Sequence, residues 1–155
     1  MWALRRAVCA LLLGLTIVPT ASARVAAGYS SGLLWPVDGA LTSPFGPRPE
    51  GFHPGIDIGL LRDLTVRAAI GGRVVTAGAQ TGYDGYGNVV VLSIGGGFTT
   101  IYAHLSHAFA RVGEEVPSGQ AIGVAGCTGW CTGTHLHFEL RGNGRPMDPL
   151  SLFDG

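Results

Sequence analysis

Three histidine-containing segments have residue types and spacings that could bind a metal and move protons. The sharpest is the segment 135–140, HLHFEL. Side chains alternate between the two faces of a strand, so His135, His137 and Glu139 would share one face and the apolar residues the other. The two imidazoles would lie ~7 Å apart at Cα, twice the rise of a strand. One could bind a metal while its neighbour handles protons, although a solvated strand face also explains this pattern when it is taken alone.

The segment 53–58, HPGIDI, places a histidine and a carboxylate four residues apart. Pro54 and Gly55 favour a turn that enters a strand over a helix. Such a turn can fold His53 back toward Asp57, and a histidine combined with a carboxylate is ordinary zinc chemistry. Taken alone, this segment is better explained by a capped turn.

The third segment is 102–105, YAHL, at the end of an expected strand. Strand alternation would place Tyr102 and His104 on the same face. A single strand histidine is usually structural, so this segment gains weight only beside the other two.

Together, the three segments provide the composition of a catalytic zinc site. His53, Asp57 and His137 supply two imidazoles and a carboxylate. They leave a fourth position for water, as in catalytic zinc sites, whereas structural zinc sites are closed by four protein ligands. His104 and His135 remain for proton transfer or for hydrogen bonding to a transition state.

Short strands between glycine turns must position these residues. Runs rich in Val, Ile, Thr and Tyr predict strands over 73–77, 88–94, 98–104, 121–125 and 135–141. Glycine clusters separate them, and no window sustains a helical stripe for three turns; residues 106–111 could form a single turn at most. The chain is therefore expected to form one compact, mostly antiparallel all-β domain.

Composition excludes several classes of protein. The 155 residues suffice for one domain, and a formal net charge of zero with no Lys/Arg run gives no footprint for nucleic acid. All ten basic residues are Arg, so the chain cannot be a biotinyl or lipoyl carrier, since those small β-domains need a modifiable lysine.

The first 23 residues have the pattern of a signal peptide. Arg5 and Arg6 precede an apolar stretch over 7–18, and the sequence Ala-Ser-Ala at 21–23 fits a signal-peptidase site. The apolar stretch is shorter than the roughly 20 residues that a membrane span needs. We expect export, no membrane association after cleavage, a flexible leader over 24–34 and a catalytic domain over 35–153.

Two cysteines lie close to the last histidine motif. Cys9 would leave with the signal peptide, and Cys127 and Cys131 are expected to pair in an oxidising compartment, reduced core thiols being the alternative. The loop that they close ends four residues before His135. We expect it to rigidify one wall of a cleft and to present Trp130 to substrate.

The segments 53–59, 69–74, 85–88, 102–105, 113–126 and 132–139 resemble the lysostaphin-type zinc metallopeptidases, which are bacterial cell-wall endopeptidases. The resemblance covers about residues 35–149 and implies a compact antiparallel β-sandwich. It also implies that His53, Asp57 and His137 bind one zinc ion and that His104 and His135 are the catalytic pair. None of these five positions is substituted, which argues against an inactive version of the fold.

The expected function is that of a secreted, monomeric zinc endopeptidase that cleaves peptidoglycan stem peptides or cross-bridges. The alternative is a non-catalytic wall-binding module that activates another peptidoglycan hydrolase. Arg48, Tyr102 and Trp130 are candidate substrate contacts. A zinc D-Ala-D-Ala carboxypeptidase, which uses a similar ligand composition, is disfavoured, because it needs a wider His–Asp spacing and a catalytic Glu two residues before a His.

Overall fold

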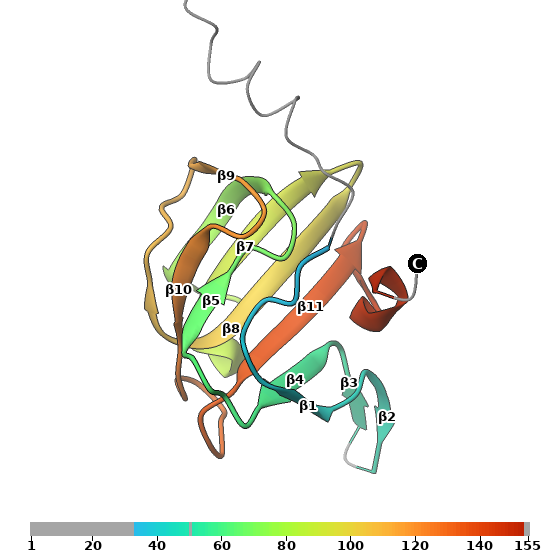
Figure 1. Ribbon diagram of the computed structural model, residues 1–155. Helices are drawn as coiled ribbons and strands as arrows, with labels where there is room; N and C mark the ends of the chain where they lie inside the picture. Colours follow the sequence, from blue (N-terminus) through green and yellow to red (C-terminus); the bar gives the residue numbers. More distant parts are fainter. Residues whose placement is uncertain (1–32, 50, 154–155) are drawn as a thin grey trace, which may run out of the picture.

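The computed structural model describes residues 33–49 and 51–153, which form twelve strands and two short 3₁₀ helices (Figure 1). The strands are β1 (Ala40–Ser43), β2 (Gly46–Arg48), β3 (Gly51–His53), β4 (Ile56–Gly59), β5 (Thr65–Arg67), β6 (Gly72–Ala79), β7 (Asn88–Gly95), β8 (Phe98–Ala108), β9 (Glu115–Val116), β10 (Ala121–Ala125), β11 (Leu136–Gly142) and β12 (Arg145–Met147). The 3₁₀ helices are η1 (Asp84–Tyr86) and η2 (Pro149–Leu152). Within these residues, no helix is long and apolar enough to cross a membrane.

One large antiparallel sheet forms the body of the domain, in the order β1-β4-β11-β8-β7-β6-β9. Strand β10 pairs with β8 and also with β5, and this places a second layer against the long strands (Figure 1). Strands β2 and β3 form a separate hairpin beside β4. The all-β, antiparallel fold expected from the sequence is therefore confirmed.

The main core lies between the two layers. It joins Val66 of β5 and Ile122 of β10 to Leu92 of β7 and Tyr102 of β8, all of them fully buried. Phe138 of β11 packs on Tyr102, with ring centroids 5.2 Å apart. A smaller cluster on the opposite face of β7 and β8 is covered by tyrosines of the η1 region. Strands β7 and β8 therefore pack against different residues on their two faces.

The expected strands are all present, but two boundaries differ. Strand β8 continues to Ala108, past the expected end at His104, because β10 pairs with its residues Leu105, His107 and Ala108. At the start of the domain, Leu33 packs against the core and the N–H of Leu34 donates to Ala69 O at 2.8 Å. Leu33 and Leu34, which were expected in the flexible leader, thus contact the domain; the expected signal peptide and residues 24–32 lie outside the described residues.

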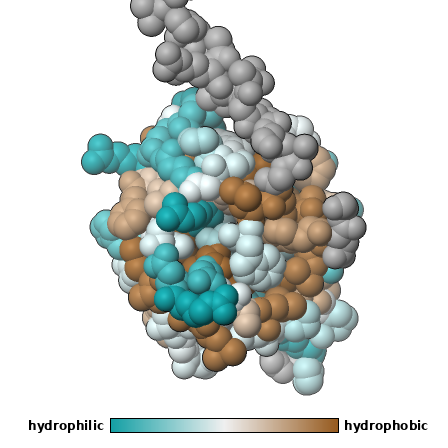
Figure 2. Space-filling view, viewed as in Figure 1, coloured by the Kyte–Doolittle hydropathy of each residue, from teal (hydrophilic) through white to brown (hydrophobic). Residues whose placement is uncertain are grey.

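The surface mixes residue types. In the view of Figure 2, hydrophobic and hydrophilic side chains alternate over the same face. Leu41, Leu60 and Leu64 are among the exposed apolar residues, at 43%, 80% and 44%. Leu41 lies on β1, Leu60 directly follows β4 and Leu64 directly precedes β5.

Candidate metal centre

The predicted metal ligands converge in one cleft of about 520 Å³. His53 Nε2 lies 3.1 Å from Asp57 Oδ1 and 3.1 Å from His137 Nδ1, and His137 Nδ1 lies 2.8 Å from Asp57 Oδ1. One ligand atom from each residue lies within 4.8 Å of the other two. The sequence therefore identified a cluster that can hold a metal ion, although its segments are up to 84 residues apart.

Strand pairing and one tight turn produce this convergence. In the β4–β11 ladder, Asp57 is the direct partner of His137, so their side chains leave the sheet together. The turn between β3 and β4 brings His53 to the same point. Gly55 makes the approach possible, because a Cβ there would collide with the Phe138 carbonyl and lie 3.1 Å from His137 Cε1.

Hydrogen bonds on the outer nitrogens orient both imidazoles. His53 Nδ1 lies 2.7 Å from Pro44 O, and His137 Nε2 lies 3.0 Å from Glu139 Oε1. Both partners accept, so the outer nitrogens carry the protons and the inner nitrogens present lone pairs to each other and to Asp57. Such mutually facing acceptors fit a shared cation, and two imidazoles with a carboxylate are a donor set that zinc prefers.

Glu139 holds the His137 imidazole in place on the side away from Asp57. Its side chain is fully buried and also accepts from Tyr86 Oη at 2.6 Å and from Arg141 Nε. Burial alone would raise the pKa of Glu139, but its hydrogen bonds to His137, Arg141 and Tyr86 lower it. Burial also opposes the imidazolium of His137, yet Asp57 and Glu139 together raise the pKa of that ring.

Arg48 extends the network to the cleft wall. Its Nη2 lies 3.2 Å from Asp57 Oδ2 and also contacts Ser43 Oγ. Burial of Asp57 favours its neutral form and would raise its pKa. The pKa of Asp57 is nevertheless well below its usual range, because its carboxylate is hydrogen-bonded to His137 and to the Arg48 guanidinium and lies near His53. Asp57 is therefore an anion at neutral pH, as a metal ligand must be.

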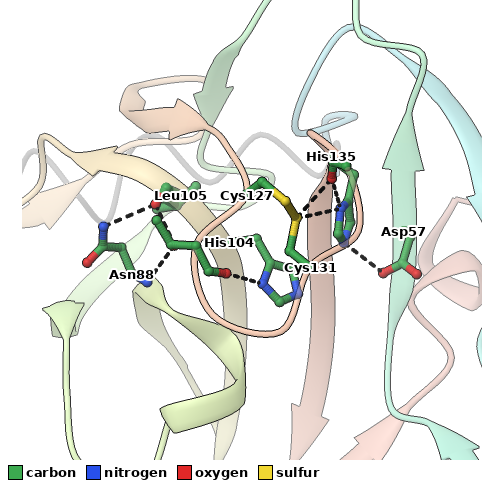
Figure 3. The surroundings of a disulfide bond; sticks show 9 residues. Asp57, Asn88, His104, Leu105, Cys127, Cys131 and His135 are labelled. Carbon is green, nitrogen blue, oxygen red and sulfur yellow. Dashed lines mark hydrogen bonds and ion pairs between the residues drawn. A yellow bond between two sulfur atoms is a disulfide. The ribbon is translucent and has the colours of Figure 1, made fainter.

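The second pair of histidines lies beside the cluster and is held by one loop. His104 Nδ1 donates to Thr128 O at 2.8 Å, and His135 Nδ1 donates to Gly133 O at 2.7 Å. Their ring centroids are 4.7 Å apart, and His135 Nε2 lies 3.8 Å from Asp57 Oδ1 (Figure 3). Burial lowers the pKa of His104, so its Nε2 carries a lone pair at neutral pH. Both rings line the cleft.

Tyr102 does not reach the cleft, which corrects one sequence-based expectation. It is fully buried in the core, and its hydroxyl accepts from the Ala69 N–H at 2.8 Å. His104 has a φ of 58°, and Ala103 and His104 together oppose the single residue Val89 in the β7–β8 ladder. This bulge breaks the alternation, so His104 turns to the site while Tyr102 stays in the core.

The remaining candidates lie at the cleft. Cys127 and Cys131 are joined by a disulfide, and the loop between them surrounds His104 in Figure 3. Trp130 in this loop is 86% exposed and lines the cleft together with Arg48. Phe52, which lines the cleft and is 57% exposed, was not anticipated. Its position next to His53 in the sequence was the only available signal.

Comparison with known proteins gives consistent relatives. DD-carboxypeptidase/endopeptidase Mpg of Neisseria meningitidis is 42% identical over 118 residues, which cover 72% of this chain and 26% of that protein. Murein hydrolase activator NlpD of Escherichia coli is 37% identical over 116 residues, covering 75% and 30%. The chain thus spans less than a third of the length of these two relatives. The name of the Neisseria relative includes a DD-carboxypeptidase. The wider His–Asp spacing that is missing from this chain therefore argues against one zinc motif, but it does not exclude the carboxypeptidase reaction.

Solved structures and a family profile agree with these relatives. The catalytic domain of lysostaphin from Staphylococcus simulans superposes with a TM-score of 0.67 at 32% identity, covering 76% of this chain and 93% of that one. The profile of Peptidase family M23 matches residues 51–149, which contain all five histidine and aspartate positions of the cleft. This match covers more than half of the chain, and the chain therefore belongs to Peptidase family M23.

Proposed function

We propose that this protein is a zinc-dependent endopeptidase that hydrolyses peptide bonds in peptidoglycan stem peptides or cross-bridges. One observation carries the proposal: the cleft combines a complete metal-ligand cluster with two further imidazoles whose Nδ1 atoms are held by carbonyl groups and whose Nε2 atoms form no hydrogen bond with the described residues. A module that only binds the wall has no chemical need for the second pair.

His53, Asp57 and His137 would hold the zinc ion. When bound there, zinc supplies Lewis acidity that polarises a substrate carbonyl and acidifies water. The three residues leave positions open to the cleft, as catalytic sites require. Their orientation is fixed before substrate arrives, because Pro44 and Glu139 each hold one imidazole.

His104 and His135 would perform the proton transfers. Each has its Nδ1 proton tied to a carbonyl, so only Nε2 can accept a proton from water or, once protonated, donate to a developing oxyanion or a leaving amine. Neutral His104 is suited to the first of these tasks, because burial keeps its pKa low. Arg48, Trp130 and Phe52 are the side chains placed to contact the substrate.

A non-catalytic activator of another hydrolase is the second candidate. The similarity to murein hydrolase activator NlpD supports it, and a cleft with exposed Trp130 and Phe52 could equally bind a protein loop. The two candidates differ in whether the purified protein cleaves a peptide bond when it holds zinc.

We further propose that the protein acts outside the cytoplasm. The pattern of residues 1–23 supports export, and the Cys127–Cys131 disulfide is typical of oxidising compartments.

Incubation of insoluble peptidoglycan with zinc-loaded and chelator-stripped protein tests the proposal. We expect new amino termini to be released in proportion to bound zinc, with about one zinc per chain, and the fragments to identify the bond. Substrates should include a stem peptide that ends in a free D-alanine, to detect carboxypeptidase activity. Stoichiometric zinc without release from walls of several chemotypes would favour the activator.

A further inference from the structure

We propose that the Cys127–Cys131 disulfide positions His135 for catalysis, so that opening the bond lowers turnover while leaving zinc binding intact. The proposal rests on the hydrolytic function given above and assigns a role to a loop that contributes no metal ligand.

The metal ligands are anchored outside this loop. His53 is held by Pro44 O, and His137 by Glu139, whose other partners are Tyr86 and Arg141. None of these residues lies between 127 and 134. Changes confined to the loop therefore leave the ligand cluster in place.

Both catalytic imidazoles, in contrast, depend on carbonyl groups of the loop. Thr128 O accepts from His104 and Gly133 O accepts from His135, and each bond fixes the tautomer and the plane of one ring. A displacement of about 1 Å in such a group can cost ~100-fold in rate.

The two anchoring carbonyls are not held equally. Thr128 is fixed through its side chain, because Oγ1 accepts from the Asn88 N–H at 2.9 Å and donates to Leu105 O at 2.8 Å. The Trp130 N–H donates to Gly85 O at 2.9 Å. This half of the loop stays in place without the disulfide.

The part of the loop that carries Gly133 is held by fewer contacts than the part that carries Thr128. Residues 132–134 are exposed, and a Cβ added at Gly133 would meet no atom within 4 Å. Within the described residues, none of the three forms a hydrogen bond outside the segment 131–135. Cys131 Sγ lies 3.0 Å from Gly133 O and 3.9 Å from His135 Nδ1 (Figure 3). The backbone of His135 is held by its N–H bond to Gly126 O at 3.2 Å, but the Gly133 carbonyl that orients its ring lies in the free half, which the disulfide ties to the fixed half.

Reduction of the disulfide should change the ring orientation of His135 more than that of His104. A phosphine reductant converts the disulfide into two thiols and becomes a phosphine oxide, taking its oxygen and the two protons from water. The Gly133 carbonyl then loses its tether, and His135 samples other ring orientations. His104 keeps its bond to Thr128.

The test compares the zinc-loaded protein with two variants. Cys127→Ser combined with Cys131→Ser opens the tether, and Thr128→Val is the matched contrast because it removes the side-chain contacts of the fixed half. Three quantities are measured: kcat and KM for peptidoglycan fragments, zinc affinity by chelator competition, and the ¹⁵N signals of the imidazoles. Melting temperatures verify that both variants fold.

For the double serine variant we expect a ~10- to 100-fold loss of kcat with KM and zinc affinity close to wild type. The His135 Nδ1–H signal should broaden or change tautomer while that of His104 persists; Thr128→Val should do the reverse. In the wild type, reduction should reproduce the serine phenotype and reoxidation should reverse it. Unchanged kcat, or weakened zinc binding, overturns the proposal. If the wild type releases nothing from any wall, the endopeptidase proposal fails, and the imidazole signals still decide whether the disulfide positions His135.

Discussion

His137 and Glu139 lie two residues apart on β11, and His137 Nε2 donates to the fully buried Glu139 Oε1 at 3.0 Å. The bond leaves Nδ1 of the imidazole facing Asp57 and His53. Partners of this kind make a ligand more basic and fix its orientation. A regular strand places His137 and Glu139 side by side, since residues two apart share a face.

The variant Glu139→Gln should weaken zinc binding about 10- to 100-fold, because the neutral amide stabilises the donor His137 less and leaves Arg141 without its carboxylate. Chelator competition measures the change. Glu115→Gln is the matched control, since Glu115 is exposed and its side chain pairs, among the described residues, with Arg73 alone. Equal zinc affinity in both variants would contradict the assigned role of Glu139.

Substitution of a metal ligand and substitution of one of the other two cleft histidines should have different effects on the zinc content of the protein. We expect His137→Ala to abolish zinc binding, whereas His104→Ala should keep about one zinc per chain and lose ~100-fold or more in kcat. Elemental analysis and fragment release measure the two effects, and His107→Ala, at an exposed position outside the cleft, serves as the control. Stoichiometric zinc in His137→Ala would remove this residue from the ligand set.

In the chelator-stripped protein, the histidines should titrate on opposite sides of the usual pKa of 6.5. Burial lowers the pKa of His53 and of His104, whereas Asp57 and Glu139 outweigh burial and raise that of His137. Between the lowered pKa values and 6.5 the unfolded chain binds more protons at His53 and His104, so these two residues make stability fall as pH drops below 6.5. His137 acts oppositely: its contribution is full below 6.5 and is lost as pH rises through its folded pKa.

Imidazole chemical shifts recorded against pH provide the measurement for that prediction. A His137 midpoint below that of His104 would show that the buried carboxylates do not govern the cluster.

Trp130→Ala should raise KM about 5- to 10-fold, on the order of 1 kcal/mol, with kcat almost unchanged. The exposed indole lines the cleft without touching the metal ligands, so it contributes binding that is equal in the ground state and the transition state. Steady-state kinetics on a soluble stem peptide would reveal this. Phe109→Ala, which removes an exposed ring outside the cleft, should leave KM unaltered. A matching rise in both variants would argue against a substrate contact.

Gly55→Ala should weaken zinc binding and lower the melting temperature. A methyl group there collides with the Phe138 carbonyl and crowds Glu139 Cγ at 2.8 Å, so the β3–β4 turn must move away from β11 and take His53 with it. Gly133→Ala, where a methyl group meets no atom within 4 Å, is the matched control for stability. Thermal melts with and without zinc test the difference, and equal melting curves for the two variants would refute the close-packing argument.

The sequence by itself predicted the antiparallel β-fold and the three residues of the ligand cluster, because strand alternation and turn composition are local properties of the chain. Alternation along 135–140 separates His137 from Phe138, and the Pro54-Gly55 turn returns His53 to Asp57. These features need only the geometry of one strand and one turn, whereas the meeting of His137 with Asp57 needs the pairing of β11 with β4.

The tertiary structure decided the rest. Strand β8 pairs with β11 up to Ala103 and with β10 from Leu105, so His104 falls where the strand changes partner and adopts a positive φ. The sequence pattern, which assumes an unbroken strand, therefore placed Tyr102 on the wrong face. The contacts of Glu139 with Tyr86, and of His104 with Thr128, join segments 53 and 24 residues apart, and only the packing of the domain brings them together.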